Sequence, residues 1–425
     1  MALRRDWLTF AHTLTTKKLI LLKTFCCYLL ALPLFVACGQ PTAKPQTNQA
    51  VDSIAPVSIA YHSLSEQDLH RYSHTSAHFF DSLLAHNFNG SVLVAKNGEV
   101  VYEKYVGYKR MNDKNDPVDE HTAFHLASVS KTFTAMATLK LWEQGKLDIH
   151  DEVSKYLTGF PFAGITIKML LSQRSGLLNY VHYMDRLGWD KRKFLTNQDL
   201  LQYIIAHKTQ VQGAPPGRHF EYCNTNYALL ALIIEKASGQ PYSEYLSKTF
   251  FEPLQMQDTY IFNLSDASKA IQSYKRNKRP YPMEFLDVVY GDKNVYSTVR
   301  DLLKWDVALR SGNLFKQTTL DSAYMPYSNE KPGKRNYGLG WRMLLEPNGK
   351  KLIYHNGWWH GNRTAFIRMI DEGATIIALS NNDCTRVYAS KKLCNLFGDY
   401  RQGNETFDES DNEQTGMKGE PTQKK

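Results

Sequence analysis

Alternating apolar residues occur in two groups near opposite ends of this chain, and mostly helical patterns fill the stretch between them. The first group, residues 90–109, has two alternating runs around Lys96-Asn97-Gly98-Glu99, a pattern that is typical of a β-hairpin. The second group has four strand-like runs separated by turn residues, at 337–345, 351–356, 362–370 and 374–381. This order predicts an α/β (α+β) fold, in which one antiparallel sheet comes from both ends and a mostly helical section is inserted between them.

The central section contains two clear helical patterns. Residues 129–144 are followed by Gly145, and residues 225–237 are followed by Ser238-Gly239, so each pattern ends at a glycine that can terminate a helix. No internal repeat of about 20 to 50 residues is visible. With 425 residues and 43% hydrophobic content, the chain can bury a large core, and we expect the folded domain to span residues 65–400.

The two ends of the chain differ from this folded part. Residues 1–38 have the pattern of a signal peptide, because basic residues precede an apolar run that is short for a membrane span. The run ends in LFVACGQ, which resembles a bacterial lipobox with Cys38 as the lipidated residue; a cleaved secretory signal or an uncleaved anchor are the alternatives. Residues 39–64 have the composition of a flexible tether and residues 401–425 that of a disordered tail. We therefore expect an exported lipoprotein, anchored in the membrane and facing the periplasm or the cell surface.

Charge and cysteine content exclude several classes of function. Without residues 1–38 the formal net charge falls from +9 to about +5, since Lys+Arg falls from 51 to 46 and Asp+Glu from 42 to 41. This charge does not indicate a nucleic-acid partner. Outside the signal the cysteines are Cys223, Cys384 and Cys394, and none has the spacing of a metal site, so we expect no metal and no cofactor. Cys384 and Cys394 either pair in an oxidising compartment or remain isolated thiols.

The segment HLASVSKTFTAM places Ser128 three residues before Lys131 at the start of a predicted helix. Residues at this spacing share a helix face, so the hydroxyl and the amine can meet. A buried lysine that has lost its charge can take the proton of a serine and activate it as a nucleophile. The pattern is weak alone, because Ser328 and Lys331 repeat it in a polar stretch that Pro332 interrupts.

This segment resembles the SxxK active-site motif of serine β-lactamases and penicillin-binding proteins. The class C branch of that family has a Tyr-x-Asn motif, which Tyr222-Cys223-Asn224 matches within a longer similar stretch at residues 214–246. Tyr327-Ser328-Asn329 and Tyr354-His355-Asn356 fit the bare pattern but not this context. The third motif, Lys-Thr-Gly, is absent; His355-Asn356-Gly357 stands in its place, as in some carboxypeptidase-type and esterase-type relatives. The alternatives are that Tyr222 caps a helical core and that His355 is only a structural hydrogen-bonding group.

The resemblance extends over residues 75–398 and implies a β-lactamase/transpeptidase-like fold and a serine hydrolase without a cofactor. It implies that Ser128 attacks a carbonyl, that Lys131 and Tyr222 move the proton, and that an acyl-enzyme forms. It also implies an oxyanion hole made by the backbone N–H groups of Ser128 and Trp358. Asn224 is expected to bond to Lys131 and to a substrate amide. His355 is expected to bond to Tyr222 or to a substrate carboxylate, and Gly357 is expected at a substrate-binding position.

The identity of the acyl donor is open at this point. A cell-wall peptide of the D-Ala-D-Ala type is the first expectation, and a β-lactam or a simple ester are alternatives. His355 lacks the permanent charge of a lysine, which argues against an efficient β-lactamase. A non-catalytic surface lipoprotein that binds cell-wall peptide is the alternative from another class. The sequence does not indicate an oligomeric state.

Overall fold

The computed structural model describes residues 63–402, which lie within one compact unit, Asp52–Lys425. The expected signal peptide, Cys38, nearly all of the tether and all but two residues of the tail lie outside the described residues. None of the helices between residues 63 and 402 is both long and apolar enough to cross a membrane.

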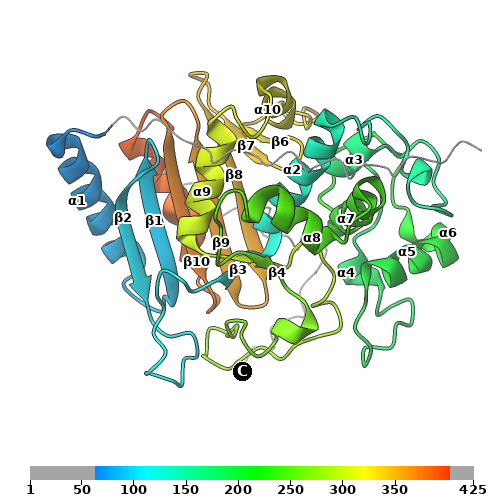
Figure 1. Cartoon of the computed structure of the whole chain (residues 1–425), viewed down its shortest axis with the longest axis horizontal. Coiled ribbons are helices and arrows are strands. Elements are labelled where there is room, and N and C mark those ends of the chain that lie inside the picture. The colour runs from blue at the N-terminus through cyan, green and yellow to red at the C-terminus, as the bar shows by residue number, and fades with distance from the viewer. Residues whose placement is uncertain (1–62, 403–425) are drawn as a thin grey trace, which may run out of the picture. The chain divides into compact units, whose positions relative to one another are not determined.

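A seven-stranded antiparallel sheet organises the described chain, with the order β2-β1-β10-β9-β8-β7-β6 (Figure 1). Strand β1 from the N-terminal part pairs with β10 from the C-terminal part, so both ends of the fold contribute to one sheet, as predicted. The bounds of these strands are β1 (Gly90–Lys96), β2 (Glu99–Val106), β6 (Arg335–Tyr337), β7 (Arg342–Leu345), β8 (Lys351–Trp359), β9 (Asn362–Met369) and β10 (Ala374–Ser380). A second sheet of three short strands has the order β3-β5-β4, with β3 (Phe124–His125), β4 (Tyr260–Ile261) and β5 (Val295–Ser297).

The predicted hairpin near the N-terminus is confirmed. Strands β1 and β2 are joined by Asn97 and Gly98, whose φ angles are 53° and 81°. A two-residue turn with two positive φ angles matches the twist of the flanking strands, and Asn-Gly is the sequence that adopts it most easily.

The second group of predicted strands needs two corrections. Residues 337–345 do not form one strand, because the chain turns between β6 and β7, where Gly340 has φ 86° and the Gly338 N–H bonds to the Trp341 carbonyl. Strand β8 does not end at Gly357. Its pairing with β9 continues to Trp359 opposite Asn362, so the third motif lies inside a strand.

The helices lie where the central section predicted them. The predicted helices at 129–144 and 225–237 are found as α2 and α7, and Gly239, with φ 72°, ends α7 in the left-handed conformation. The longer helices are α1 (Glu66–Leu83), α2 (Ser130–Glu143), α5 (Asn197–Ala206), α7 (Asn224–Ser238), α9 (Val299–Arg310) and α10 (Gln317–Ala323). Shorter helical segments are η1 (Ala127–Val129), η2 (Val153–Lys155), α3 (Ile167–Leu171), α4 (Tyr180–Tyr183), α6 (Lys208–Val211), α8 (Tyr242–Leu246), η3 (Ser247–Phe251) and η4 (Leu264–Asp266). The 12-residue segment η5 (Thr385–Leu396) is a 3-10 helix.

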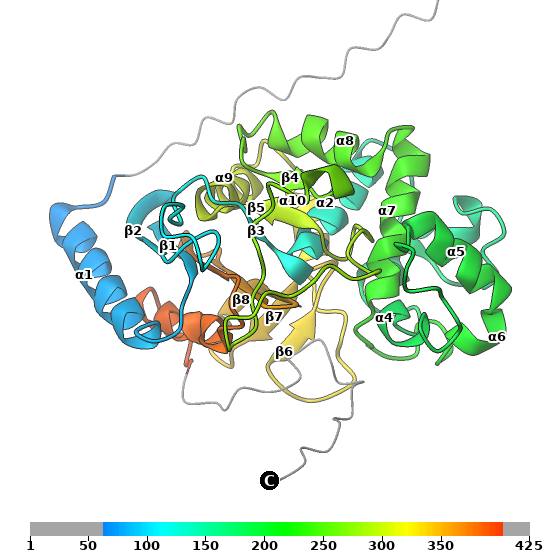
Figure 2. The same ribbon diagram turned by 90° about the horizontal axis from the view of Figure 1, so that it is seen from below.

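Helical segments cover both faces of the large sheet, and α3 to α8 form a separate group beside it (Figure 1, Figure 2). Helix α1 and η5 pack on one face, while α9 and α2 lie on the other. Successive side chains of a strand point to opposite faces of the sheet. Val92 and Val94 of β1 therefore pack in the core on the α1 side, and Leu93 and Ala95 pack in the larger core on the α2 and α9 side.

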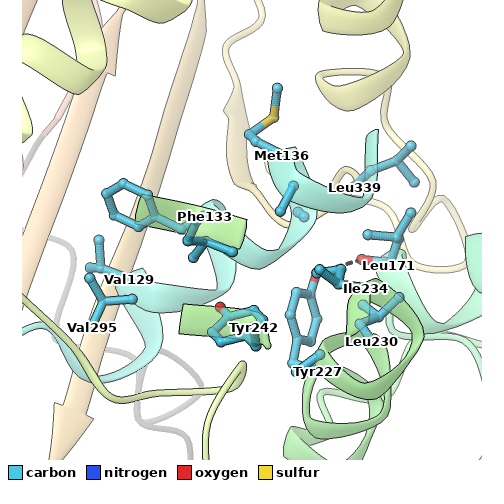
Figure 3. Packing of buried hydrophobic residues seen from close by; sticks show 14 of the residues in the cluster. Val129, Phe133, Met136, Leu171, Tyr227, Leu230, Ile234, Tyr242, Val295 and Leu339 are labelled. Carbon is cyan, nitrogen blue, oxygen red and sulfur yellow. Dashed lines mark hydrogen bonds between the residues drawn. The ribbon is translucent and has the colours of Figure 1, made fainter. Parts of the chain in front are cut away.

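Helix α2 crosses the centre of the larger core and is held by α7 (Figure 3). Phe133 of α2 stacks on Trp305 of α9, with ring centres 4.7 Å apart. Tyr227 of α7 packs nearby, and its hydroxyl donates a hydrogen bond of 2.7 Å to the Leu171 carbonyl (Figure 3). Residues Ser130 to Leu139 are all buried, so the helix that carries the SxxK motif is fixed by packing on every side.

Candidate active site

Ser128 lies in the tight turn η1, directly before α2. The preceding residue, Ala127, has φ 49°, a left-handed conformation that costs energy for a residue with a side chain. Lys131 Nζ lies 2.7 Å from Ser128 Oγ, so the predicted i, i+3 contact is formed. Ser128 is 3% exposed and Lys131 is fully buried, which places the amine in surroundings of low polarity.

His125 holds the turn η1 in place through a hydrogen bond to its backbone. The Ala127 N–H donates to His125 Nδ1 at 3.0 Å, and His125 Nε2 lies 3.0 Å from Asn294 Oδ1. Burial lowers the pKa of His125 to about 4, so the ring is neutral near pH 7. The short strand β3 ends at this histidine and pairs with β5 opposite Tyr296. The sequence analysis gave His125 no role, although it opens the motif segment.

The Lys131 amine has a second contact that the sequence analysis missed: it donates a hydrogen bond of 2.8 Å to the backbone carbonyl of Asp292. The Asp292 side chain is itself fixed, because Tyr180 Oη donates to Asp292 Oδ2 at 3.0 Å and Lys293 Nζ lies 3.4 Å from the same oxygen. Burial and the Asp292 carboxylate raise the pKa of Tyr180, which stays a proton donor. A signal was present in the sequence, since polar Asp292-Lys293-Asn294 directly precedes a strand that is fully buried.

Tyr222 approaches Lys131 from the loop before α7, with the Lys131 amine 5.1 Å from the centre of its ring. Gln173 fixes this loop: its side-chain oxygen accepts from the Cys223 N–H at 3.1 Å and from Asn226 Nδ2 at 2.7 Å. The SxxK helix and the Tyr-x-Asn loop therefore meet, as the resemblance implies.

Asn224 is buried at the first position of α7, and its side-chain oxygen accepts no hydrogen bond from any described residue. The expected bond from Asn224 Oδ1 to Lys131 is therefore not formed. The amine donates to the Asp292 carbonyl, and the Asn224 oxygen is buried without a hydrogen-bond partner among the described residues.

The third motif differs from expectation at His355. Its ring is fully buried, Nδ1 lies 2.6 Å from the Asn356 carbonyl, and Nε2 lies 3.5 Å from the Tyr337 hydroxyl. Burial, together with the positive charge of Arg342, holds the pKa of His355 well below its usual range. The hydrogen-bond neighbour of this ring is thus Tyr337 rather than Tyr222, whose ring centre lies 6.3 Å away.

Gly357 brings strand β8 against the nucleophile turn. A Cβ atom at this position would lie 2.3 Å from the Leu126 carbonyl oxygen and 2.3 Å from Thr364 Oγ1, so only glycine fits. The Thr364 hydroxyl donates to the same Leu126 carbonyl at 2.7 Å. Trp358 follows on the strand, close to the turn that holds Ser128. Its role in an oxyanion hole stays a prediction.

One edge of β8 is available beside this site. Strand β7 pairs only with Lys351–Tyr354, so from His355 to Trp359 the partner among the described strands is β9 alone. An unpaired strand edge offers backbone N–H and C=O groups to an extended chain. The turn η1, which holds Ser128, contacts β8.

The second SxxK pattern does not have these features. Ser328 lies in the loop before β6, where its backbone N–H bonds to Asn336 Oδ1. Lys331 is exposed, whereas Lys131 is fully buried. The Ser328 pattern therefore lacks the buried amine that faces Ser128.

Within residues 63–402, the grouping of side chains that most resembles a metal site is Glu284, Asp287 and His360. Asp287 Oδ1 already accepts from Trp359 Nε1 at 2.8 Å and lies 2.9 Å from His360 Nε2. The hydrogen bonds use the atoms that a metal would need, so the cluster is explained as support for the residues after β8. The three described cysteines are free thiols, and Cys384 and Cys394 do not pair.

Comparison with known proteins identifies the family. The model of the beta-lactamase family matches residues 77–391. The chain belongs to the beta-lactamase family. Penicillin-binding protein 4* of Bacillus subtilis (strain 168) is 34% identical over 315 residues, which cover 70% of this chain and 69% of that protein. Putative penicillin-binding protein PbpX of the same organism is 31% identical, over 60% of this chain and 61% of its own length.

Solved structures of this family share the fold. The octameric penicillin-binding protein homologue from Pyrococcus abyssi has a TM-score of 0.65 and 26% identity, over 76% of this chain and 77% of that chain. The D-amino acid amidase from Ochrobactrum anthropi SV3 has a TM-score of 0.62 and 23% identity, over 77% of this chain and 99% of that chain. The predicted β-lactamase/transpeptidase-like fold is confirmed, and the chain is a serine hydrolase of the β-lactamase and penicillin-binding protein family.

Proposed function

We propose that this protein hydrolyses peptide amide bonds of the cell-wall D-Ala-D-Ala type, as a carboxypeptidase-like enzyme that forms an acyl-enzyme on Ser128. The contact of 2.7 Å between the buried Lys131 amine and Ser128 Oγ is the observation that carries the proposal. A buried lysine held on the Asp292 carbonyl and facing a serine is suited to remove its proton.

The proposed reaction has two halves. Ser128 Oγ attacks the scissile carbonyl while its proton passes to the Lys131 and Tyr222 pair, and the C–N bond breaks as Tyr222 returns the proton to the leaving amine. The backbone N–H groups of Ser128 and Trp358 stabilise the negative oxygen. Water then attacks the ester, its proton follows the same route, and Ser128 is regenerated with release of the acid.

The choice of substrate rests on the relatives and on the third motif. The curated relatives named above are penicillin-binding proteins, and one solved structure of the same fold is an amidase of D-amino acids. An efficient β-lactamase is less well supported, because the ring of His355 is buried and neutral, so the third motif lacks a permanent charge. We expect Asn224 to bind a substrate amide, which favours a peptide over a simple ester.

The proposed location follows from the same substrate. Cell-wall peptide lies outside the cytoplasmic membrane, and the chain begins with a signal-like segment and a lipobox-like LFVACGQ. We propose that Cys38 is lipidated and anchors the enzyme at the periplasmic or outer surface of a membrane. Mass spectrometry of the membrane fraction would detect the diacylated Cys38 as the mature N-terminus.

Four reagents distinguish the candidate activities. The purified protein is incubated with a D-alanyl-D-alanine peptide, a labelled penicillin, a chromogenic cephalosporin and a short-chain nitrophenyl ester, and intact mass identifies any adduct. We expect peptide cleavage and a slowly turned-over penicillin adduct on Ser128. Rapid cephalosporin loss would point to a β-lactamase and ester turnover alone to an esterase. No turnover and no adduct would leave a non-catalytic binding protein.

Replacing Ser128 by alanine is expected to lower peptide turnover at least about a thousandfold, because the acyl-enzyme cannot form. The variant should keep its melting temperature, since Ser128 contributes a small side chain at the end of a turn. Ser328→Ala is the matched control, because it removes the serine of the other SxxK pattern, and this variant should still form the penicillin adduct on Ser128. Normal turnover by Ser128→Ala would overturn the assignment of the nucleophile.

A further inference from the structure

A large cavity of about 970 Å³ lies next to the proposed active site. Its wall is made by residues 219–220 of the loop that leads to Tyr222, by the loop 328–337, and by the facing side chains of β7 and β8. The volume is in the range of pockets that hold a drug-sized ligand, and it is far larger than one carboxylate group requires.

Arg342 connects this cavity to the catalytic residues. It lines the cavity at the first position of β7, where it lies opposite Tyr337 of β6 and Tyr354 of β8. Its guanidinium carbon is 4.9 Å from the centre of the Tyr222 ring. The positive charge of Arg342 also contributes to the low pKa of His355. The cavity therefore adjoins both Tyr222 and the third motif.

The wall of the cavity is strongly basic. Among residues 63–402, Lys331, Lys334, Arg335 and Arg342 line it, together with one acidic residue, Glu330. Glu330 pairs with Arg174, and Lys334 pairs with Glu346 at 3.0 Å. The aromatic rings of Phe220 and Tyr337, whose centres are 5.3 Å apart, lie between the basic groups and Tyr222. Guanidinium groups bind carboxylates through two parallel hydrogen bonds, so this lining fits an acidic group on an otherwise apolar stem.

We propose that this cavity is a subsite for an acidic residue of the substrate peptide, bound by Arg335 and Arg342. The inference rests on the proposed function, and it deepens it by naming the substrate class: peptides that carry a side-chain carboxylate near the scissile bond. Arg342, at the first position of β7 and opposite Tyr337, supplies the permanent positive charge that the His355 motif lacks. The size of the cavity accommodates a whole acidic residue rather than a terminal carboxylate alone.

Matched peptides test the subsite. All carry the same D-alanyl-D-alanine bond. One series has glutamate or glutamine one, two or three residues before the D-alanyl-D-alanine unit, and a second pair has a terminal carboxylate or carboxamide. For the unaltered protein we expect kcat/KM to be about tenfold higher for glutamate than for glutamine at one of the three positions, the size of one charge-assisted hydrogen bond. The ratio should fall as salt is raised from about 0.05 to about 0.5 M.

Two variants locate the effect. Arg335→Gln and Arg342→Gln should each bring the glutamate-to-glutamine ratio close to one, while Lys208→Gln on α6, which lies outside the cavity lining, should leave the ratio intact. Arg335 is exposed at the first position of the edge strand β6, so its variant should fold even if Arg342→Gln does not. A melting curve accompanies each variant.

The failures are distinguishable. Peptide turnover with a ratio near one at all three positions, or discrimination that is confined to the terminal pair, overturns the subsite and leaves the proposed function intact. A tenfold ratio that survives both arginine variants also overturns it. No turnover of any peptide by the unaltered protein contradicts the proposed function itself.

Discussion

His125 shows how a single buried side chain can control the nucleophile turn. To accept the Ala127 N–H at 3.0 Å, Nδ1 needs its lone pair, so the neutral ring with its proton on Nε2 is the form that fits. Burial lowers the pKa of His125 to about 4. The hydrogen bond with Asn294 and the Asp287 carboxylate raise this pKa, but they do not offset the burial. The charges of His360 and Lys293 lower the pKa further. Protonation would remove the acceptor that holds the backbone one residue before Ser128.

Stability is therefore expected to fall as the pH drops from about 6.5 towards 4. The folded pKa of His125 lies below the unfolded value, so the unfolded chain binds more protons in this window and the free energy of unfolding rises with pH. The shift corresponds to a loss of about 3 kcal/mol when the effect is complete. His355 acts in the same direction, because its pKa is lowered as well.

The variant His125→Asn tests this explanation, because its side-chain oxygen can accept the Ala127 N–H without titrating. Urea unfolding at pH values between 4 and 7 should show a flatter dependence than in the unaltered protein. His150→Asn, on an exposed turn, is the control and should keep the original slope. An unchanged slope in His125→Asn would show that this ring is not the group that titrates.

At this scale, local contacts were predictable and distant ones were not. Ser128 and Lys131 share one turn of chain, so their spacing alone predicted the contact of 2.7 Å. The Asp292 carbonyl and the Tyr337 hydroxyl reach the site from segments far along the chain, and no local pattern indicates such a pairing. The expected bond from Asn224 Oδ1 to Lys131 is not formed, because this oxygen is buried without a hydrogen-bond partner.

Among the elements, strand β8 has two partners of different kinds. Lys351–Tyr354 pair with β7, whereas His355 to Trp359 do not. This second part of β8 packs against the nucleophile turn through Gly357. The close approach of the Gly357 Cα to the Leu126 carbonyl sets the distance between the strand and Ser128. The sequence predicted the strand from its alternation, but its length was underestimated, because the continued pairing is decided by β9.

Gly357→Ala is expected to push β8 away from the turn. The added methyl group would destabilise the fold by about 1–3 kcal/mol and lower kcat at least about a hundredfold, because the groups around Ser128 separate. Gly90→Ala in β1 is the matched control: its Cβ would lie 1.9 Å from the Leu379 carbonyl in the same sheet, away from the site. Its melting temperature should fall while kcat per folded molecule is kept. Equal kcat values for the two variants would contradict a positioning role for Gly357.

In the whole molecule, the sheet joins segments from opposite ends of the described chain. Strand β1 lies between β2 and β10, with Gly90 opposite Ser380, so the first hairpin has no complete neighbour until the last strand is in place. The two-part pattern of alternating residues predicted this architecture, and the family resemblance predicted its class. The three-stranded sheet of β3, β5 and β4 was missed, because strands of two or three residues carry no periodic signal.

Cutting the chain within the polar loop before β6 is expected to separate two pieces that cannot fold alone. A fragment of residues 63–331 lacks β6 to β10 and exposes the apolar face of β1, so it should be insoluble or protease-sensitive. Co-expression with residues 332–402 should restore a soluble complex with peptide turnover, because the pairing of β1 with β10 needs no covalent link. Recovery is measured by co-purification and by kcat. A soluble, folded fragment 63–331 would show that the helical section is an independent domain.

The contacts of the Ser128 turn also depend on the order in which the chain is synthesised. The Leu126 carbonyl is bound by Thr364 and covered by Gly357, both of which are synthesised long after the serine itself. A chain still emerging from the ribosome or from an export channel therefore carries the nucleophile but lacks the strands that place it. Hydrolytic activity is therefore expected only after β8 and β9 have been synthesised and have packed against the turn.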